Sequence, residues 1–109
     1  MNENFWKDKY PEGLPTEINP DQYPNIQAVL KESCQRFADK PAFTNLGKTL
    51  TYGDIYRLSG DFAAWLQNYT DLQPGDRIAV QLPNLLQYPV VVFGAIRAGL
   101  VVVNTNPLY

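Results

Sequence analysis

The sequence predicts an α/β fold with a parallel sheet, and three consecutive stretches carry this prediction. Residues 77–82 read as a strand, a helix follows and ends near Gly99, and residues 101–103 read as a second strand. Strand, helix and strand in this order form a βαβ unit, whose strands are parallel neighbours joined by a right-handed crossover. Helices normally cover both faces of a parallel sheet, and a sheet of this kind needs more strands than the two predicted here. We therefore expect residues 25–109 to be an incomplete α/β segment of a larger domain.

Two helices and a hairpin are expected before the βαβ unit. The first helix covers residues 25–38, with Asn25 as its N-cap. Its apolar stripe consists of Ile26, Val29, Leu30, Cys34 and Phe37. Two β-like runs on either side of Leu46-Gly47 then predict a short hairpin.

The second helix covers residues 51–69, where Thr51 and Asp54 have the spacing of a capping box. Its expected apolar face consists of Ile55, Leu58, Phe62, Trp65 and Tyr69, with Ala63 and Leu66 beside them. This spacing predicts a helix that faces the core, because a coiled coil would need several more heptads.

Residues 1–24 are expected to form an extended arm, because four prolines exclude a long helix there. Water is a poor environment for aromatic rings, so we expect the aromatic side chains of the arm to pack on the globular body. These side chains are Phe5, Trp6, Tyr10 and Tyr23. The alternative is contact with a membrane surface, which Lys7 and Lys9 favour but Asp8 and Glu12 oppose.

The composition excludes several classes of function. The chain has 109 residues, of which 45% are apolar and 18% charged, as in globular proteins. Nine basic and eleven acidic residues give a net charge of −2, so we expect no nucleic-acid partner. One cysteine and no histidine exclude a Ser-His-Asp triad, a Cys-His pair and the common zinc spacings within this chain. Cys34 is expected to be a small core residue, because it lies at helical spacing from Leu30 and Phe37.

No motif in the chain indicates catalytic, cofactor-binding or metal-binding residues. Gly94 and Gly99 have the spacing of a phosphate loop, but the Lys and Ser/Thr that should follow are absent. They also lie at the end of a helix, whereas phosphate binding uses the start of one. We expect these glycines to allow close packing and to cap the helix.

Position indicates where a ligand would lie. In open parallel sheets, ligands bind beyond the carboxyl ends of the strands. Asn84 follows the first strand of the βαβ unit, and Asn104 and Asn106 follow the second. These three residues are therefore candidate site residues. The alternative, which is the commoner role of Asn in loops and the one we favour, is that they satisfy turn and cap groups.

Two motifs resemble the core motifs of adenylate-forming enzymes. LTYGDI at 50–55 resembles the first, and IRAGLVVVNTNPLY at 96–109 resembles the second. Between them, GDRIAVQLPNLLQYPVVVFG is similar to the corresponding segment of acyl-CoA synthetases. The leading YPEGLPTEINPDQYPN and the closing VVVNTNPLY narrow the resemblance to bacterial long-chain-fatty-acid–CoA ligases.

The resemblance implies the N-terminal part of the large domain of such an enzyme. These ligases join a long-chain fatty acid to ATP as an acyl-adenylate, release pyrophosphate, and transfer the acyl group to coenzyme A. Mg²⁺ offsets the phosphate charge. The phosphate loop, the ribose-binding Asp and the lid Lys of the family come later in the chain. We therefore expect this chain to be inactive alone, and to stop at Tyr109 because expression or proteolysis truncated it.

Two further expectations concern the location of the parent enzyme and the association of this chain. The parent enzyme should be cytoplasmic, with a peripheral contact to the inner membrane. The chain alone should self-associate through exposed sheet edges and apolar faces. Two alternatives stay open: another adenylate-forming ligase for aryl or short-chain acids, and a non-enzymatic oligomerisation or binding module built on the βαβ unit.

Overall fold

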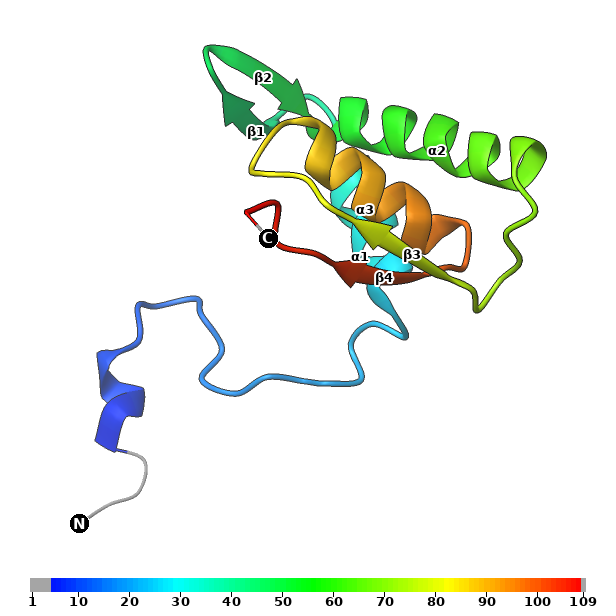
Figure 1. Cartoon of the computed structure of the whole chain (residues 1–109). Helices are drawn as coiled ribbons and strands as arrows, with labels where there is room; N and C mark the ends of the chain where they lie inside the picture. The colour runs from blue at the N-terminus through cyan, green and yellow to red at the C-terminus, as the bar shows by residue number, and fades with distance from the viewer. Residues whose placement is uncertain (1–4, 109) are drawn as a thin grey trace.

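The computed structural model describes residues 5–108 and contains the predicted helices, hairpin and βαβ unit (Figure 1). Helix α3 lies at the centre, where it contacts α1, α2 and both strands of the parallel sheet. In chain order the elements are η1 (Phe5–Lys9), α1 (Ile26–Arg36), β1 (Pro41–Asn45), β2 (Lys48–Thr51), α2 (Tyr52–Tyr69), β3 (Arg77–Val80), α3 (Gln87–Arg97) and β4 (Val101–Asn104).

Side-chain caps start α1 and α2 where the sequence predicts them. Asn25 Oδ1 accepts a hydrogen bond from the Ala28 backbone N–H at 2.9 Å. Thr51 Oγ1 accepts from Asp54 N–H at 3.1 Å, and Asp54 Oδ2 accepts from Thr51 N–H at 2.9 Å. The Thr51 backbone N–H holds the pKa of the Asp54 carboxyl below its usual value. Each cap satisfies a backbone group that the first helical turn leaves without a partner.

The hairpin and the end of α3 both use left-handed backbone. Leu46 and Gly47 have φ angles of 51° and 79° and form the two-residue turn between β1 and β2. Gly99 has a φ angle of 83°, and its N–H bonds the Ile96 carbonyl while Leu100 N–H bonds that of Ala95. These two bonds are a Schellman motif, which stops the helix and turns the chain into β4.

Strands β3 and β4 are parallel, with Arg77 opposite Val101 and Val80 opposite Asn104. The side chains of Ile78, Val80 and Val102 are buried or half-buried on the face that α3 covers. On the other face, Val101 and Val103 are 48% and 42% exposed. Within residues 5–108, helices therefore cover one face of this sheet.

The contact between α2 and α3 is very close. A Cβ atom added to Gly94 would lie 2.9 Å from the Ser59 carbonyl oxygen and 2.7 Å from Phe62 Cδ2. Arg97 Nη1 donates to the Tyr56 carbonyl at 2.6 Å and to Ser59 Oγ at 2.9 Å. The predicted role of Gly94 in close packing is confirmed, whereas the contacts of Arg97 and Ser59 were not predicted.

The predicted apolar face of α2 is partly wrong. Its buried residues are Ile55, Ser59, Ala63 and Leu66. Trp65 and Tyr69 are 50% and 77% exposed, although they belong to the predicted stripe. The small residues Ser59 and Ala63 set the packing face because they let α3 approach, and this places the bulky rings at its margin.

The apolar stripe of α1 is likewise buried only in part. Leu30 and Cys34 join Ile55 in a small core cluster. Ile26 and Val29, in the first turn of this helix, are 58% and 39% exposed.

The prediction that the arm packs on the globular body is wrong for three of its four aromatic residues. Phe5, Trp6 and Tyr10 are exposed, and the arm runs away from the helices and strands (Figure 1). Trp6 packs instead on Tyr10, with ring centroids 5.4 Å apart. Tyr23 is half-buried, and a hydrogen bond with Glu32 of α1 raises the pKa of its phenol.

We predict that Leu66→Asp unfolds the chain. Leu66 is 2% exposed and packs with Ala63, Ala95, Ala98 and Leu100. An unpaired carboxylate at this place would cost several kcal/mol, on the order of the whole stability of a small domain. Thermal unfolding followed by circular dichroism measures the effect.

Gln67→Asp is the matched control, because Gln67 is the exposed neighbour of Leu66 on the same helix. It introduces the same charge at the same end of α2, and we expect a change below about 0.5 kcal/mol. Similar melting temperatures for the two variants would mean that Leu66 does not face the core.

Candidate functional site

The carboxyl ends of β3 and β4 meet at one edge of the sheet, and two of the predicted site residues, Asn104 and Asn106, lie there. β3 ends at Val80 and β4 ends at Asn104, which lies opposite it. Thr105 N–H donates to the Val80 carbonyl at 2.9 Å and continues the pairing by one bond. Gln81 Nε2 donates to the Asn106 carbonyl at 3.4 Å. The loop after β4 is thus fastened to the end of β3.

Asn106 holds its own turn. Its Oδ1 accepts from the Leu108 backbone N–H at 2.9 Å, which is the usual Asx-turn bond of an asparagine in a loop. This contact supports the structural role that the sequence favours for Asn106.

Asn104 makes a different contact, because its side chain bonds a residue outside its own turn. Its Oδ1 accepts a hydrogen bond from the Tyr88 hydroxyl at 2.6 Å. Tyr88 lies in the first turn of α3, sixteen residues earlier in the chain. Asn104 itself is exposed at the edge of the sheet.

Asn84 lies on the loop between β3 and α3, and its backbone links that loop to the hairpin. Its carbonyl accepts a hydrogen bond from Asn45 Nδ2 at 3.3 Å. Asn84 and Tyr88 also line one cavity of about 290 Å³ between this loop and the hairpin. Tyr88 therefore adjoins two of the three predicted residues.

Sequence reasoning missed Tyr88. It considered residues that follow strands, whereas Tyr88 lies in the first turn of α3 and reaches the sheet edge from that helix. The start of α3 next to the end of β3 was the available signal, because it brings the first turn of the helix to the same edge.

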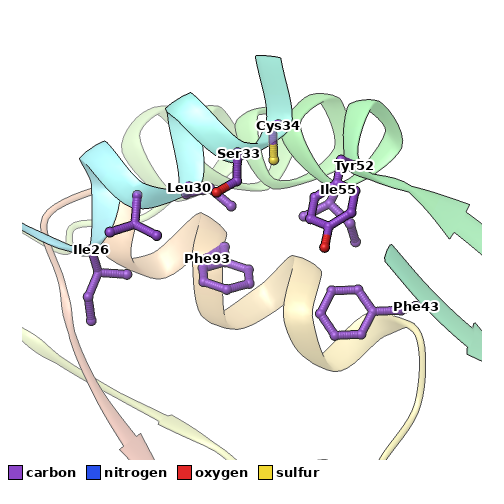
Figure 2. A pocket seen from close by; sticks show the side chains of 9 residues that line it. Ile26, Leu30, Ser33, Cys34, Phe43, Tyr52, Ile55 and Phe93 are labelled. Carbon is purple, nitrogen blue, oxygen red and sulfur yellow. The ribbon is translucent and has the colours of Figure 1, made fainter. Parts of the chain in front are cut away.

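A second pocket, of about 170 Å³, is apolar and lies between α1, the start of α2, α3 and the hairpin (Figure 2). Figure 2 shows Phe93 of α3, Phe43 of β1 and Leu30 of α1 around it. Cys34 borders the pocket, and burial raises the pKa of its thiol, which disfavours the nucleophilic thiolate. The predicted role of Cys34 as a small core residue agrees with its 3% exposure.

The described residues do not fit a magnesium site. Between Phe5 and Leu108, no group of three or more His, Cys, Asp and Glu side chains is placed to hold a metal ion. In the same range, every buried side-chain nitrogen and oxygen has a hydrogen-bond partner. We therefore derive no catalytic step through ATP or Mg²⁺ in this segment.

Residues 30–109 match the family model described as AMP-binding enzyme. The match spans most of the chain, and the chain belongs to this family. The resemblance found in its motifs is thereby confirmed.

The curated relatives include long-chain-fatty-acid–CoA ligases, to which the chain is similar over nearly its whole length. A long-chain-fatty-acid–CoA ligase of Escherichia coli O6:H1 is 50% identical over 104 residues, which are 95% of this chain and 18% of the relative. One from Bacillus subtilis (strain 168) is 43% identical, again over 95% of this chain and 18% of the relative. Triostin synthetase I of Streptomyces triostinicus is 35% identical over 72% of this chain and 15% of the relative. The chain thus spans less than a fifth of the length of these relatives.

Solved structures share the fold. The N-terminal subdomain of Klebsiella oxytoca NpsA gives a TM-score of 0.74 at 25% identity, over 77% of this chain and 22% of that one. VinN in complex with L-aspartate gives 0.71 at 35% identity, over 75% of this chain and 23% of that one.

We predict that Asn106→Ala lowers the free energy of unfolding by less than about 1 kcal/mol, because it removes one exposed turn bond. Urea unfolding of the chain measures this loss. In a longer enzyme that contains this segment, saturating turnover should stay within twofold of wild type. A hundredfold loss without destabilisation corresponds to about 2.7 kcal/mol of transition-state stabilisation, and it would place Asn106 in the active site.

Proposed function

We propose that this chain is the N-terminal segment of an ATP-dependent long-chain-fatty-acid–CoA ligase. The parent enzyme converts a fatty acid, ATP and coenzyme A into acyl-CoA, AMP and pyrophosphate through an acyl-adenylate. The observation that carries the proposal is the identity of 50% to such a ligase over 95% of this chain. The family match over residues 30–109 covers both motif regions, at 50–55 and 96–109.

In this proposal the segment is a scaffold for a site that other residues complete. The edge with Asn104 and Asn106, together with the adjoining loop that carries Asn84, borders that site, since parallel sheets bind ligands beyond their carboxyl ends. ATP, Mg²⁺ and coenzyme A are held mainly by parts of the parent outside this segment.

A second candidate is a ligase for an amino acid or an aryl acid. It is favoured by the identity of 35% to VinN, a protein solved with L-aspartate. It is also favoured by the fold shared with the NpsA subdomain, which was solved with anthranilyl-AMSN. Both identities are lower than that to the fatty-acid ligases.

A panel of acids separates these candidates. The longer enzyme is incubated with ATP, Mg²⁺ and coenzyme A, and with palmitate, 3-hydroxybenzoate or aspartate as the acid, and pyrophosphate is followed. We expect palmitate to give the highest kcat/KM and palmitoyl-CoA to appear by mass spectrometry. A higher kcat/KM with one of the other acids would replace this proposal by the second candidate.

We predict that the 109-residue chain alone releases no pyrophosphate above background in the same assay. The reason is that its described residues lack a group to hold magnesium. The longer enzyme is the positive control. Turnover by the isolated chain would contradict the scaffold role.

We also propose that the parent is a cytoplasmic enzyme whose exposed arm makes a peripheral membrane contact. Phe5 is 60% exposed and Trp6 37%, and Lys7 and Lys9 lie beside them. Aromatic rings flanked by lysines suit the interface of an anionic bilayer. In the described part of the chain, no helix has the length and apolar character needed to span a membrane.

We further propose that the isolated chain self-associates. Within residues 5–108 the parallel sheet has two strands, so each keeps one backbone edge without a strand partner. Val101 and Val103 add an exposed apolar face to these edges. Unpaired edges and apolar patches recruit other chains, and a second copy of this chain supplies the complementary edge.

Light scattering over a concentration series tests this prediction. We expect the mean mass to rise above that of a monomer, and the double variant Val101→Lys, Val103→Lys to reduce the rise. The matched control is Gln35→Lys, Gln67→Lys, which adds the same charge at exposed helical positions. A wild-type chain that stays monomeric at high concentration would contradict self-association.

A further inference from the structure

Tyr88 connects two elements at the candidate edge. Its hydroxyl donates to Asn104 Oδ1 at 2.6 Å, so the first turn of α3 is tied to the last residue of β4. The Tyr88 ring is half-buried, and the next residue, Pro89, is buried. The hydroxyl therefore projects from a fixed part of the helix.

This bond decides which part of the Asn104 carboxamide is available. An asparagine side chain offers an acceptor oxygen and a donor NH₂ group. Tyr88 occupies the oxygen, and the hydrogen bonds that described residues 5–108 make to this side chain use Oδ1 alone. Because Asn104 is exposed, its NH₂ group is presented at the edge as a hydrogen-bond donor.

The backbone around Asn104 is fixed independently of Tyr88. Thr105 N–H bonds the Val80 carbonyl, and Gln81 Nε2 bonds the Asn106 carbonyl. Asn106 closes the turn with its own side chain. The loop is thus held without Tyr88, and the bond from Tyr88 orients a side chain.

We propose that Tyr88 is a positioning residue, which orients Asn104 so that its NH₂ group donates to an oxygen of the bound substrate. A single amide donor at this edge suits an acceptor oxygen, either of the acid's carboxylate or of a phosphoryl group. The inference rests on the proposed function in one respect: the edge must border the adenylation site of the parent enzyme.

The test uses the longer enzyme and the variants Tyr88→Phe, Asn104→Ala and the double variant. The assay uses whichever acid of the panel wild type adenylates best. Tyr88→Phe removes the hydroxyl and keeps the ring, and we expect kcat to fall about tenfold, or about 1.4 kcal/mol. Asn104→Ala should cost at least as much, and the double variant should be no worse than Asn104→Ala, because both act through one group.

Tyr69→Phe is the matched control, since Tyr69 is an exposed tyrosine at the end of α2. It should keep the wild-type kcat and the wild-type KM values for the acid and for ATP. In the Tyr88→Phe variant, a rise in KM for the acid would identify a carboxylate oxygen, and a rise in KM for ATP a phosphoryl oxygen.

Asn104→Asp separates positioning from stability. The carboxylate still accepts the Tyr88 hydroxyl but cannot donate, so we expect an unchanged melting temperature and an activity as low as that of Asn104→Ala. Wild-type activity in Asn104→Asp would overturn the proposal, as would kcat and KM values within twofold of wild type in Tyr88→Phe. If another acid proves better than palmitate, the proposed function fails, but the comparison of these variants still decides the role of Tyr88.

Discussion

The close contact between α2 and α3 is the constraint on which the other elements depend. At Gly94 the two helices approach so closely that an added Cβ atom would lie 2.9 Å from the Ser59 carbonyl oxygen. Arg97 then bonds both Ser59 and the Tyr56 carbonyl, and its guanidinium stacks 4.2 Å from the centre of the Tyr56 ring. A helix held along its length in this way is a fixed platform, because interior packing tolerates little change in volume.

The position of α3 determines where Asn104 and Tyr88 lie at the candidate edge. The C-terminus of α3 turns at Gly99 into β4, and the turn leads directly to the strand that carries Asn104. The N-terminus of α3 carries Tyr88, whose hydroxyl returns to Asn104. Both ends of α3 therefore help to set the position of the Asn104 side chain. A shift of α3 would displace β4 and Tyr88 together.

The segment with high identity to fatty-acid ligases is held together by local caps and by close helix packing. Family membership rests on the match over 30–109, and the described residues supply packing, caps and a hydrogen-bonded edge. This division is common in α/β enzymes, where a rigid sheet positions groups that arrive from several parts of the chain. In the proposed function, the segment forms one wall of the site.

The sequence by itself determined the features that depend on neighbouring residues. Asn25 and Thr51 cap their helices, Leu46-Gly47 turns the hairpin, and Gly99 ends α3, because each acts on backbone groups within a few residues. The order of strand, helix and strand determined the parallel pairing, since a chain of this pattern has few other ways to return. The motifs likewise gave the family.

Only the tertiary structure decided which surfaces meet. Trp65 and Tyr69 have the spacing of a core stripe, yet the small Ser59 and Ala63 face α3, because close approach of two helices excludes large side chains. The arm's aromatic residues Phe5, Trp6 and Tyr10 are exposed, since their apolar character does not specify a partner surface. Tyr88 reaches Asn104 across sixteen residues of sequence, and no local pattern encodes the distance between two atoms that only packing brings together.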